Sequence, residues 1–227
     1  KGGRRPAGEA ASEETTHAYE ITIGSEAIHY HLSGNLFRNP AQSPYLNKKA
    51  ADEIATFGHV ATRHDAREKA SSNARYPLEA WQSCRESLND IELQRPMEPA
   101  GSPLHSDGLV AVRRRGDGGF QLARLSWLLV APDTATLHIA LHLMPGVARA
   151  VTVSIPGSGA AARARHDRGY CLPAIESLQQ AATVLIPAGC FRLGLVIEIS
   201  DDGVRRVRLG QLLDRGVDFD RCTYDMA

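Results

Sequence analysis

The amino-acid sequence predicts a mainly β protein: an antiparallel β-barrel with flanking short helices and an N-terminal extension. The first observation is the segment Gly108–Ile155, which alternates or runs apolar and is broken by Gly-Asp-Gly-Gly, Ala-Pro-Asp and Met-Pro-Gly. Apolar stretches separated by such turn residues are typical of an antiparallel meander. The second observation is the C-terminal third, where short β-like stretches are each bounded by Pro, Gly or Asp. The first observation argues against helical and βαβ architectures for the middle of the chain.

Length and composition bound the remaining possibilities. The chain has 227 residues and is 43% hydrophobic, which is enough for one large domain or one domain with an accessory unit. Lys plus Arg and Asp plus Glu number 26 each, so the net charge gives no reason to expect a nucleic-acid polymer or a membrane surface as partner. The basic residues are mostly Arg, which suits forked contacts with phosphate and guanine but also follows from a GC-rich genome.

The cysteines and the chain start indicate a compartment. No two cysteines form a CxxC pair, so we expect no zinc or redox motif and a reducing environment. No apolar run approaches the roughly 20 residues of a membrane span. The chain starts at Lys1 and shows no signal-type segment. We therefore expect a cytoplasmic protein, cut from a longer chain. The four cysteines are Cys84, Cys171, Cys190 and Cys222.

The N-terminal part divides into a tether and an extension. Residues 1–16 are small, polar and aperiodic, which predicts a flexible tether. Residues 17–73 form the extension. Within it, alternation in Tyr19–Ile23 and again in Ala27–Leu32 predicts a hairpin, and Asn47–Phe57 has the cap and apolar spacing of a short helix. An Arg-rich stretch without a clear secondary structure completes the extension.

Residues 74–227 are expected to hold the barrel and its C-terminal elements. The barrel itself should run from about Ala74 to Ser200, with errors of several residues at its bounds. Residues 156–170 are basic and rich in small residues, which predicts a flexible connection. Leu178–Ala182 suits a helical turn. Residues 208–216 (RLGQLLDRG) fit either a strand running into a turn or a short amphipathic helix.

Two groups of residues could carry ligand chemistry. Arg63 and Arg67 stand four positions apart and share one face if their segment is helical, so their guanidinium groups could grip a phosphate and a guanine edge. A solvated polar loop explains the same spacing. Ser87, Asn89 and Asp90 could offer a hydroxyl, an amide and a carboxylate to a bound base, or could simply turn the chain between two strands.

Other polar residues favour structural roles. Arg113–Arg115 end a strand at a glycine-rich turn, where they add positive potential or form a solvated hairpin tip. His29 and His31, like His138 and His142, would share a strand face, but no carboxylate stands at a spacing that suggests a metal site. The sequence has no Gly-x-Ser-x-Gly elbow, glycine-rich phosphate loop or HExxH. We therefore expect no metal, no cofactor and no enzymatic activity.

The order of these pieces resembles a known family. An Arg pair, a strand and a Ser-containing turn are followed by GFQLARLSWL, LHIALHLM and LPAIESLQQAATVLIPAGCFRLGLVIEI. This pattern, from Trp81 to Tyr224, is similar to the PilZ domain family, in particular to the carboxy-terminal PilZ-type modules of longer betaproteobacterial proteins. The resemblance covers roughly two thirds of the chain at the level of strand patterns. It implies a six-stranded barrel that serves as a receptor for cyclic di-GMP.

Carried over to this sequence, the first family motif, RxxxR, falls on Arg63 and Arg67. By resemblance these arginines would clamp the phosphates of the dinucleotide and contact its guanines. The second family motif has the form [D/N]-x-S-x-x-G. This sequence matches it only at Ser87. Arg85 stands at the position of the Asp or Asn, and Asp90 stands at the position of the Gly.

The departure from the second motif leaves two functions open. In the first, Asn89 and Asp90 replace the missing base readers in a shifted turn. The chain is then a regulatory module that binds cyclic di-GMP and transmits the signal through a conformational or partner-binding change. In the second, the chain is a degenerate barrel that binds no nucleotide and acts as a protein-interaction module. In both, the expected macromolecular partner is another protein or other domains of a longer chain.

Overall fold

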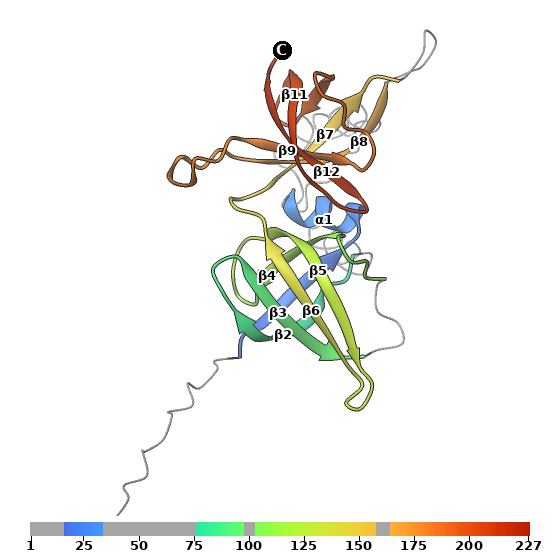
Figure 1. The fold of residues 1–227 in the computed structure, drawn as a ribbon, viewed down its shortest axis with the longest axis vertical. Helices are drawn as coiled ribbons and strands as arrows, with labels where there is room; N and C mark the ends of the chain where they lie inside the picture. Colours follow the sequence, from blue (N-terminus) through green and yellow to red (C-terminus); the bar gives the residue numbers. More distant parts are fainter. Residues whose placement is uncertain (1–15, 34–75, 98–102, 158–163) are drawn as a thin grey trace, which may run out of the picture.

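The protein consists of two six-stranded antiparallel barrels, each closed on itself, with a short helix between them (Figure 1). The computed structural model describes residues 16–33, 76–97, 103–157 and 164–227. The mainly β prediction is confirmed. Within the described ranges, no helix is long and apolar enough to cross a membrane.

The first barrel is closed by the N-terminal strand. Its strands follow one another around the barrel in the order β1, β2, β3, β6, β5, β4, and β1 pairs with both β2 and β4. Its interior is filled by aliphatic residues and by Trp81, which is 2% exposed. The strands are β1 (Ala18–Ile23), β2 (Glu79–Glu86), β3 (Asp90–Pro96), β4 (Leu109–Arg114), β5 (Gln121–Ala131) and β6 (Thr136–Leu143).

The second barrel follows directly in the chain. Its strand order is β10, β11, β12, β9, β8, β7, and its interior is mainly aliphatic. The fully buried Asp220 is a polar hub, because its carboxylate accepts hydrogen bonds from the backbone N–H groups of Gly189 and Phe191 and from Nε of Arg215. The strands are β7 (Arg149–Ile155), β8 (Arg165–Leu172), β9 (Thr183–Pro187), β10 (Val196–Ser200), β11 (Val204–Arg215) and β12 (Phe219–Met226).

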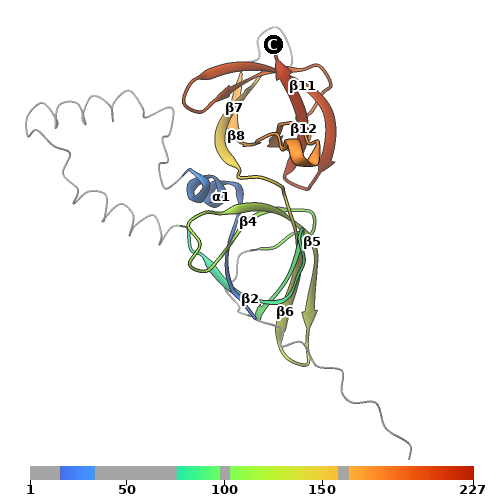
Figure 2. The same ribbon diagram turned by 90° about the vertical axis from the view of Figure 1, so that its left-hand side faces the viewer.

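Helix α1 (Ser25–Leu32) lies between the two barrels (Figures 1 and 2). Its Ile28 is fully buried in a hydrophobic cluster to which both barrels contribute. Hydrogen bonds join the same surfaces. Tyr170 Oη of β8 donates to the carbonyl of Ser25 at 2.9 Å, and the Asp218 carboxylate accepts the backbone N–H of Leu109 at 3.0 Å. The other buried members of the cluster are Leu109, Ala111, Phe120, Leu122, Met144, Ala148, Tyr170, Leu172, Leu185 and Phe219.

The structure divides the chain differently from the sequence prediction. The meander is present as β4, β5 and β6, but its last strand, β7, leaves the first barrel and begins the second. The chain turns away at Gly146, whose φ of 89° is costly for other residues. Met144 and Ala148 on either side are buried between the barrels. Two barrels therefore replace the single one expected from about Ala74 to Ser200.

The predicted N-terminal hairpin is half wrong. Tyr19–Ile23 lies within β1, but Ala27–Leu32 belongs to helix α1. Both edges of β1 are occupied by β2 and β4, so no edge remains for a hairpin partner. Gly24, with φ 89°, ends the strand, and the apolar residues that follow pack between the barrels as a helix.

Smaller predictions have mixed outcomes. The prediction of a flexible connection over 156–170 is wrong from Arg165 onward, because Arg165–Leu172 forms β8. Gly169 of this strand is closely packed: a Cβ there would meet Val153 Cγ1 at 2.6 Å. A 3-10 turn occupies Glu176–Leu178 and overlaps the helical turn predicted at Leu178–Ala182 only at Leu178. Residues 208–216 lie almost wholly in strand β11. Residues 1–15 of the predicted tether and the helix predicted at Asn47–Phe57 lie outside the described residues.

The Asp218–Leu109 hydrogen bond should stabilise the joint between the barrels. Asp218→Ala removes the acceptor and is expected to lower the free energy of unfolding by about 1 kcal/mol, the typical value of one hydrogen bond. Asp218→Asn keeps an oxygen acceptor and should cost clearly less. Urea unfolding of the two variants and the wild type measures both; equal losses in the two variants would contradict the role of the hydrogen bond.

Stability should fall below neutral pH because of two histidines in α1. Burial lowers the pKa of His29 and of His31 below the ordinary value of 6.5. The unfolded chain therefore binds protons that the folded chain excludes, so the free energy of unfolding decreases as the pH drops through 6.5. Urea unfolding at about pH 7.5 and about pH 5.5 measures this decrease. It should be smaller in the double variant His29→Gln/His31→Gln; an unchanged decrease would overturn the assignment.

Candidate functional site

Three of the predicted site residues lie where β2 connects to β3: Ser87 and Asn89 belong to the turn, and Asp90 is the first residue of β3. Ser87, Asn89 and Asp90 are all exposed there. Arg63 and Arg67 lie outside the described residues, so the structure does not test whether they approach this turn.

The turn is held by its own polar groups. Ser87 Oγ accepts the backbone N–H of Asp90 at 3.0 Å and donates to the carbonyl of Asp90 at 3.2 Å. The Asp90 carboxylate in turn accepts a hydrogen bond from Nδ1 of His142 at 2.8 Å, which links the turn to β6. The carbonyl of Asn89 accepts the backbone N–H of Leu143. Ser87 and Asp90 thus have structural partners and remain exposed.

Beside the turn is a surface pocket of about 300 Å³, which we name the turn pocket. It lies on the outer face of the first barrel and is lined by groups of different chemistry: a guanidinium, two carboxylates, two hydroxyls, an indole and a methyl. Of the predicted residues it includes Ser87 and Asp90, whereas Asn89 does not line it. The lining residues are Arg85, Ser87, Asp90, Glu92, Ser126, Trp127 and Ala140.

The strand register explains why these groups converge. Arg85 stands opposite Glu92, Glu92 opposite Ala140, and Ala140 opposite Trp127, so four neighbouring strands contribute one continuous row. Directly paired residues on adjacent strands point to the same face. Ala140 is the small member of the row and leaves the hollow between Glu92 and the indole.

Two β-bulges place the ends of this row. The register of β2 shifts between Ser83 and Arg85, and that of β5 shifts between Leu125 and Trp127. A bulge inserts one residue and so changes which side chains face outward. Beyond the bulge in β5, Trp127 lies on the outer face of the barrel and is 40% exposed. Neither Trp127 nor Glu92 was predicted as a site residue, because the strand register that brings them together leaves no clear sequence signal.

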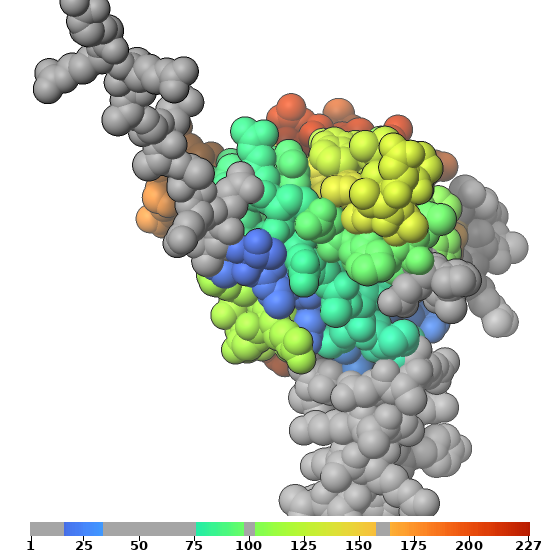
Figure 3. All heavy atoms as spheres, turned by 90° about the horizontal axis from the view of Figure 1, so that it is seen from below, coloured from blue at the N-terminus to red at the C-terminus, as the bar shows by residue number. Residues whose placement is uncertain are grey.

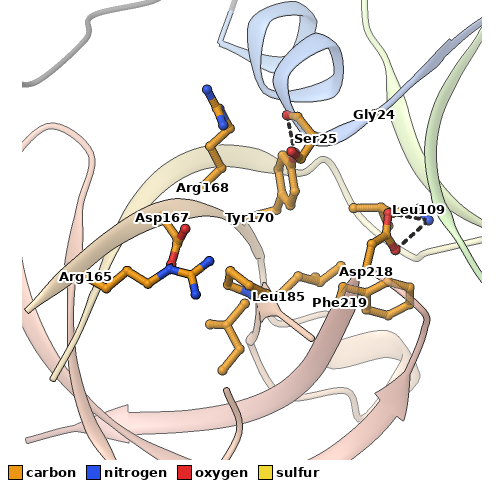
Figure 4. Close-up of a pocket in the computed structure, with 12 residues that line it drawn as sticks. Gly24, Ser25, Leu109, Arg165, Asp167, Arg168, Tyr170, Leu185, Asp218 and Phe219 are labelled. Atoms are coloured by element: carbon orange, nitrogen blue, oxygen red, sulfur yellow. Dashed lines mark hydrogen bonds and ion pairs between the residues drawn. The ribbon is translucent and has the colours of Figure 1, made fainter. Parts of the chain in front are cut away.

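A second cleft, of about 380 Å³, lies at the joint between the barrels (Figure 4). Its two arginines are already engaged: Arg165 Nε is 2.5 Å from Asp167 Oδ2, and an Nη of Arg168 is 2.8 Å from a carboxylate oxygen of Glu26. Because each cation has an anionic neighbour, the cleft lacks the excess positive charge that would attract a phosphate.

The remaining polar candidates have local roles. Arg113 pairs with Glu20 of β1 at 2.6 Å, and its guanidinium lies over the ring of Phe120. His29 and His31 belong to α1 rather than to a strand, and each has a ring nitrogen within hydrogen-bonding distance of a backbone carbonyl. In the described part of the chain, no three His, Cys, Asp or Glu side chains gather in a group that could hold a metal ion.

The fold and the pocket define a mainly β protein of two joined six-stranded barrels, with a polar, partly aromatic pocket on the first. Residues 157–227, which contain β8 to β12, match the model of the FimW C-terminal beta-barrel domain. The second barrel is thus the part that resembles this family. No curated protein matches the chain. Among solved structures, MrkH from K. pneumonia matches with a TM-score of 0.24 and 9% identity, over 66% of this chain and 74% of that chain.

The hydrogen bonds of Ser87 should stabilise the turn. Ser87→Ala is expected to lower the free energy of unfolding by about 1 kcal/mol, because it removes both bonds to Asp90. Ser126→Ala is the matched control, since Ser126 also lines the pocket and its side chain has no hydrogen bond to a described residue. It should change stability by less than about 0.5 kcal/mol. Equal values in chemical denaturation would contradict the role assigned to Ser87.

Proposed function

We propose that the chain is a PilZ-like regulatory module that binds cyclic di-GMP in the turn pocket. The observation that carries this proposal is the row from Arg85 through Glu92 and Ala140 to Trp127, next to Ser87 and Asp90. It combines, on one concave surface, the chemical groups that recognise a guanine nucleotide.

Each group suits one part of the ligand. The exposed face of Trp127 offers a stacking surface for a base, an interaction worth about 1–3 kcal/mol per base. The carboxylates of Asp90 and Glu92 can accept hydrogen bonds from the N–H groups of guanine. These two carboxylates would take over the role of the Asp or Asn of the second family motif, whose position Arg85 occupies here. The Arg85 side chain is 77% exposed, and its Nη1 lies 3.9 Å from Oε1 of Glu92. This loose ion pair leaves the guanidinium able to reach a phosphate or the O6 and N7 edge of guanine.

The pocket needs further cations to hold a dianionic ligand. Among its lining residues, Arg85 faces the two carboxylates Asp90 and Glu92. By resemblance, Arg63 and Arg67 supply the missing positive charge and clamp the phosphates. Both arginines belong to the segment that connects α1 to β2, and α1 fills the interface between the barrels. Ligand capture through this segment therefore gives a route by which binding alters the barrel joint and the partner surface. The proposed role is that of a receptor, with no catalytic step.

Calorimetric titration with cyclic di-GMP tests the proposal. The wild type should release or absorb heat and melt at a higher temperature at tens of micromolar ligand, because a ligand stabilises the folded state it binds. Trp127→Ala should weaken binding by about tenfold or more through the loss of stacking. Leu129→Ala is the control: Leu129 is exposed on the same strand and does not line the pocket.

The arginine pair is tested separately. Arg63→Ala/Arg67→Ala should abolish measurable binding and leave the melting temperature of the free protein unchanged. Unchanged affinity in both this variant and Trp127→Ala would place the ligand elsewhere. The absence of heat and of a thermal shift in the wild type would rule out the receptor function.

A non-binding interaction module is the second candidate. It is favoured by the turn itself, in which Ser87 and Asp90 already bond to each other and to His142. In this case the altered motif is a stable structural turn, and the barrels present surfaces to another protein or to other domains of a longer chain. A partner that is retained equally with and without cyclic di-GMP, together with a silent titration, would support this function.

A further inference from the structure

His142 of β6 lies beside the turn pocket on the outer face of the first barrel. Its neighbours Leu141 and Leu143 pack into the barrel core, so the alternation of the strand directs His142 outward. It stands directly opposite Asp90 of β3 and two positions from Ala140, the small residue of the pocket. Seen from below, β2 and β3 (teal) and the β5–β6 hairpin (yellow) lie side by side on this surface (Figure 3). His142 therefore flanks the pocket without lining it.

Asp90 is held at both its backbone and its side chain. Ser87 fixes the backbone, because its Oγ accepts the N–H of Asp90 and its own N–H donates to the carbonyl of Asp90 at 2.8 Å. His142 fixes the carboxylate, because its Nδ1 donates to Oδ1 of Asp90 at 2.8 Å. An exposed side chain otherwise moves among rotamers, and ordering it on binding costs affinity. The Asp90 carboxylate is thus oriented before a ligand arrives.

The oriented carboxylate can still accept hydrogen bonds from a base. No hydrogen bond from the described residues reaches Oδ2 of Asp90, and a carboxylate has about four lone-pair sites on its two oxygens. Guanine presents two donors side by side, the N1–H and the N2 amino group. Adenine has an acceptor at N1 and no amino group at position 2. An Asp90 carboxylate in a fixed orientation therefore pairs with guanine and repels adenine.

Among the described residues, none orients Glu92, the other acceptor carboxylate of the pocket, in this way. The nearest cation given for it is Nη1 of Arg85 at 3.9 Å, a separation too long for a hydrogen bond. A Glu side chain also has one more rotatable bond than an Asp side chain. Glu92 thus attracts donors as a mobile charge, whereas Asp90 offers them a fixed acceptor. Selection between bases therefore depends on Asp90.

The arginine on the other side of His142 leaves this pair intact. Arg124 of β5 stands directly opposite His142. Its Nη1 lies 3.0 Å from Oδ1 of Asp214 in the second barrel and 3.9 Å from Oδ1 of Asp107. The guanidinium is thus engaged at the joint between the barrels, and the imidazole is the group that holds Asp90.

We propose that His142 is a positioning residue that makes the turn pocket selective for guanine, because its Nδ1 holds the Asp90 carboxylate in the orientation that reads the base. This inference rests on the proposed receptor function. The side chains of the pair are 45% and 58% exposed, and such exposed pairs contribute little to stability. Loss of the imidazole should therefore change which base is bound and leave the fold intact.

Titrations with cyclic di-GMP and with its adenine analogue, cyclic di-AMP, measure this selectivity. The wild type should bind the guanine dinucleotide at least about tenfold more tightly, because the carboxylate would face an acceptor in adenine. His142→Ala should lower the ratio of the two affinities about fivefold to tenfold. His142→Asn should restore most of it, since its Nδ2 can replace Nδ1 as the donor. Trp127→Ala should instead weaken both dinucleotides alike, because stacking is tolerant of the base.

His138→Ala is the matched control. His138 lies on the same strand and face as His142, opposite Gln94 rather than Asp90, and does not line the pocket. Its replacement should leave the ratio of affinities unchanged. Melting curves of the variants check that they remain folded.

The hydrogen bond itself can be observed without a ligand. Imidazole nitrogen NMR of the free protein should show a proton on Nδ1 of His142, and this resonance should move in Asp90→Ala, which lacks the acceptor. An unmoved resonance, or a ratio of affinities in His142→Ala equal to that of the wild type, would overturn the inference and leave the receptor function standing. A wild type that binds neither dinucleotide would overturn the receptor function, and the inference with it.

Discussion

The arrangement of the molecule depends on the burial of α1 between the two barrels. Ile28 has no exposed surface, and the cluster around it draws side chains from strands of both barrels and from the connection between β6 and β7. Without this apolar layer, the joint would be held by a few hydrogen bonds such as those of Tyr170 and Asp218, each of which contributes only about 1 kcal/mol. The hydrophobic layer therefore holds the two barrels together, and the hydrogen bonds add a smaller stabilisation to one relative orientation.

The turn pocket illustrates how irregular backbone creates a site on a regular scaffold. A barrel wall without bulges would alternate inward and outward residues along β2 and β5 throughout. The two bulges break this alternation and bring Arg85 and Trp127 into the same outward row, on either side of Glu92 and Ala140. The chemistry of the pocket thus comes from strands that are separated in sequence and joined only by register.

Local sequence patterns predicted the local parts of this structure. The meander and the turn at Ser87 were found because alternation and turn residues report directly on strands and their connections. The division into two barrels was missed because β6 and β7 follow each other with only Met-Pro-Gly-Val-Ala between them, a break that also fits a hairpin. Helix α1 was missed for a related reason: its short apolar pattern fits a strand equally well, and only the pairing of both β1 edges excludes a hairpin. The sequence alone was enough to predict Ser87 and Asp90 as residues of the candidate site. The positions of Trp127 and Glu92 in it depend on the strand register, which the sequence does not reveal.

The closure of the first barrel by β1 has a consequence for how the chain folds. The backbone N–H of His17 bonds to Ser83, 66 positions away, and Glu20 pairs with Arg113, 93 positions away. Loop entropy must be lost before such distant contacts form, and a high contact order slows folding. During synthesis, β1 emerges from the ribosome long before β4, the strand that closes the barrel on its other side. The second barrel is built from strands closer in sequence than these: its most distant pairing, β7 with β10, joins Thr152 to Ser200. The N-terminal strand and helix should therefore be the last elements to become ordered, and the joint between the barrels should mature only when they do.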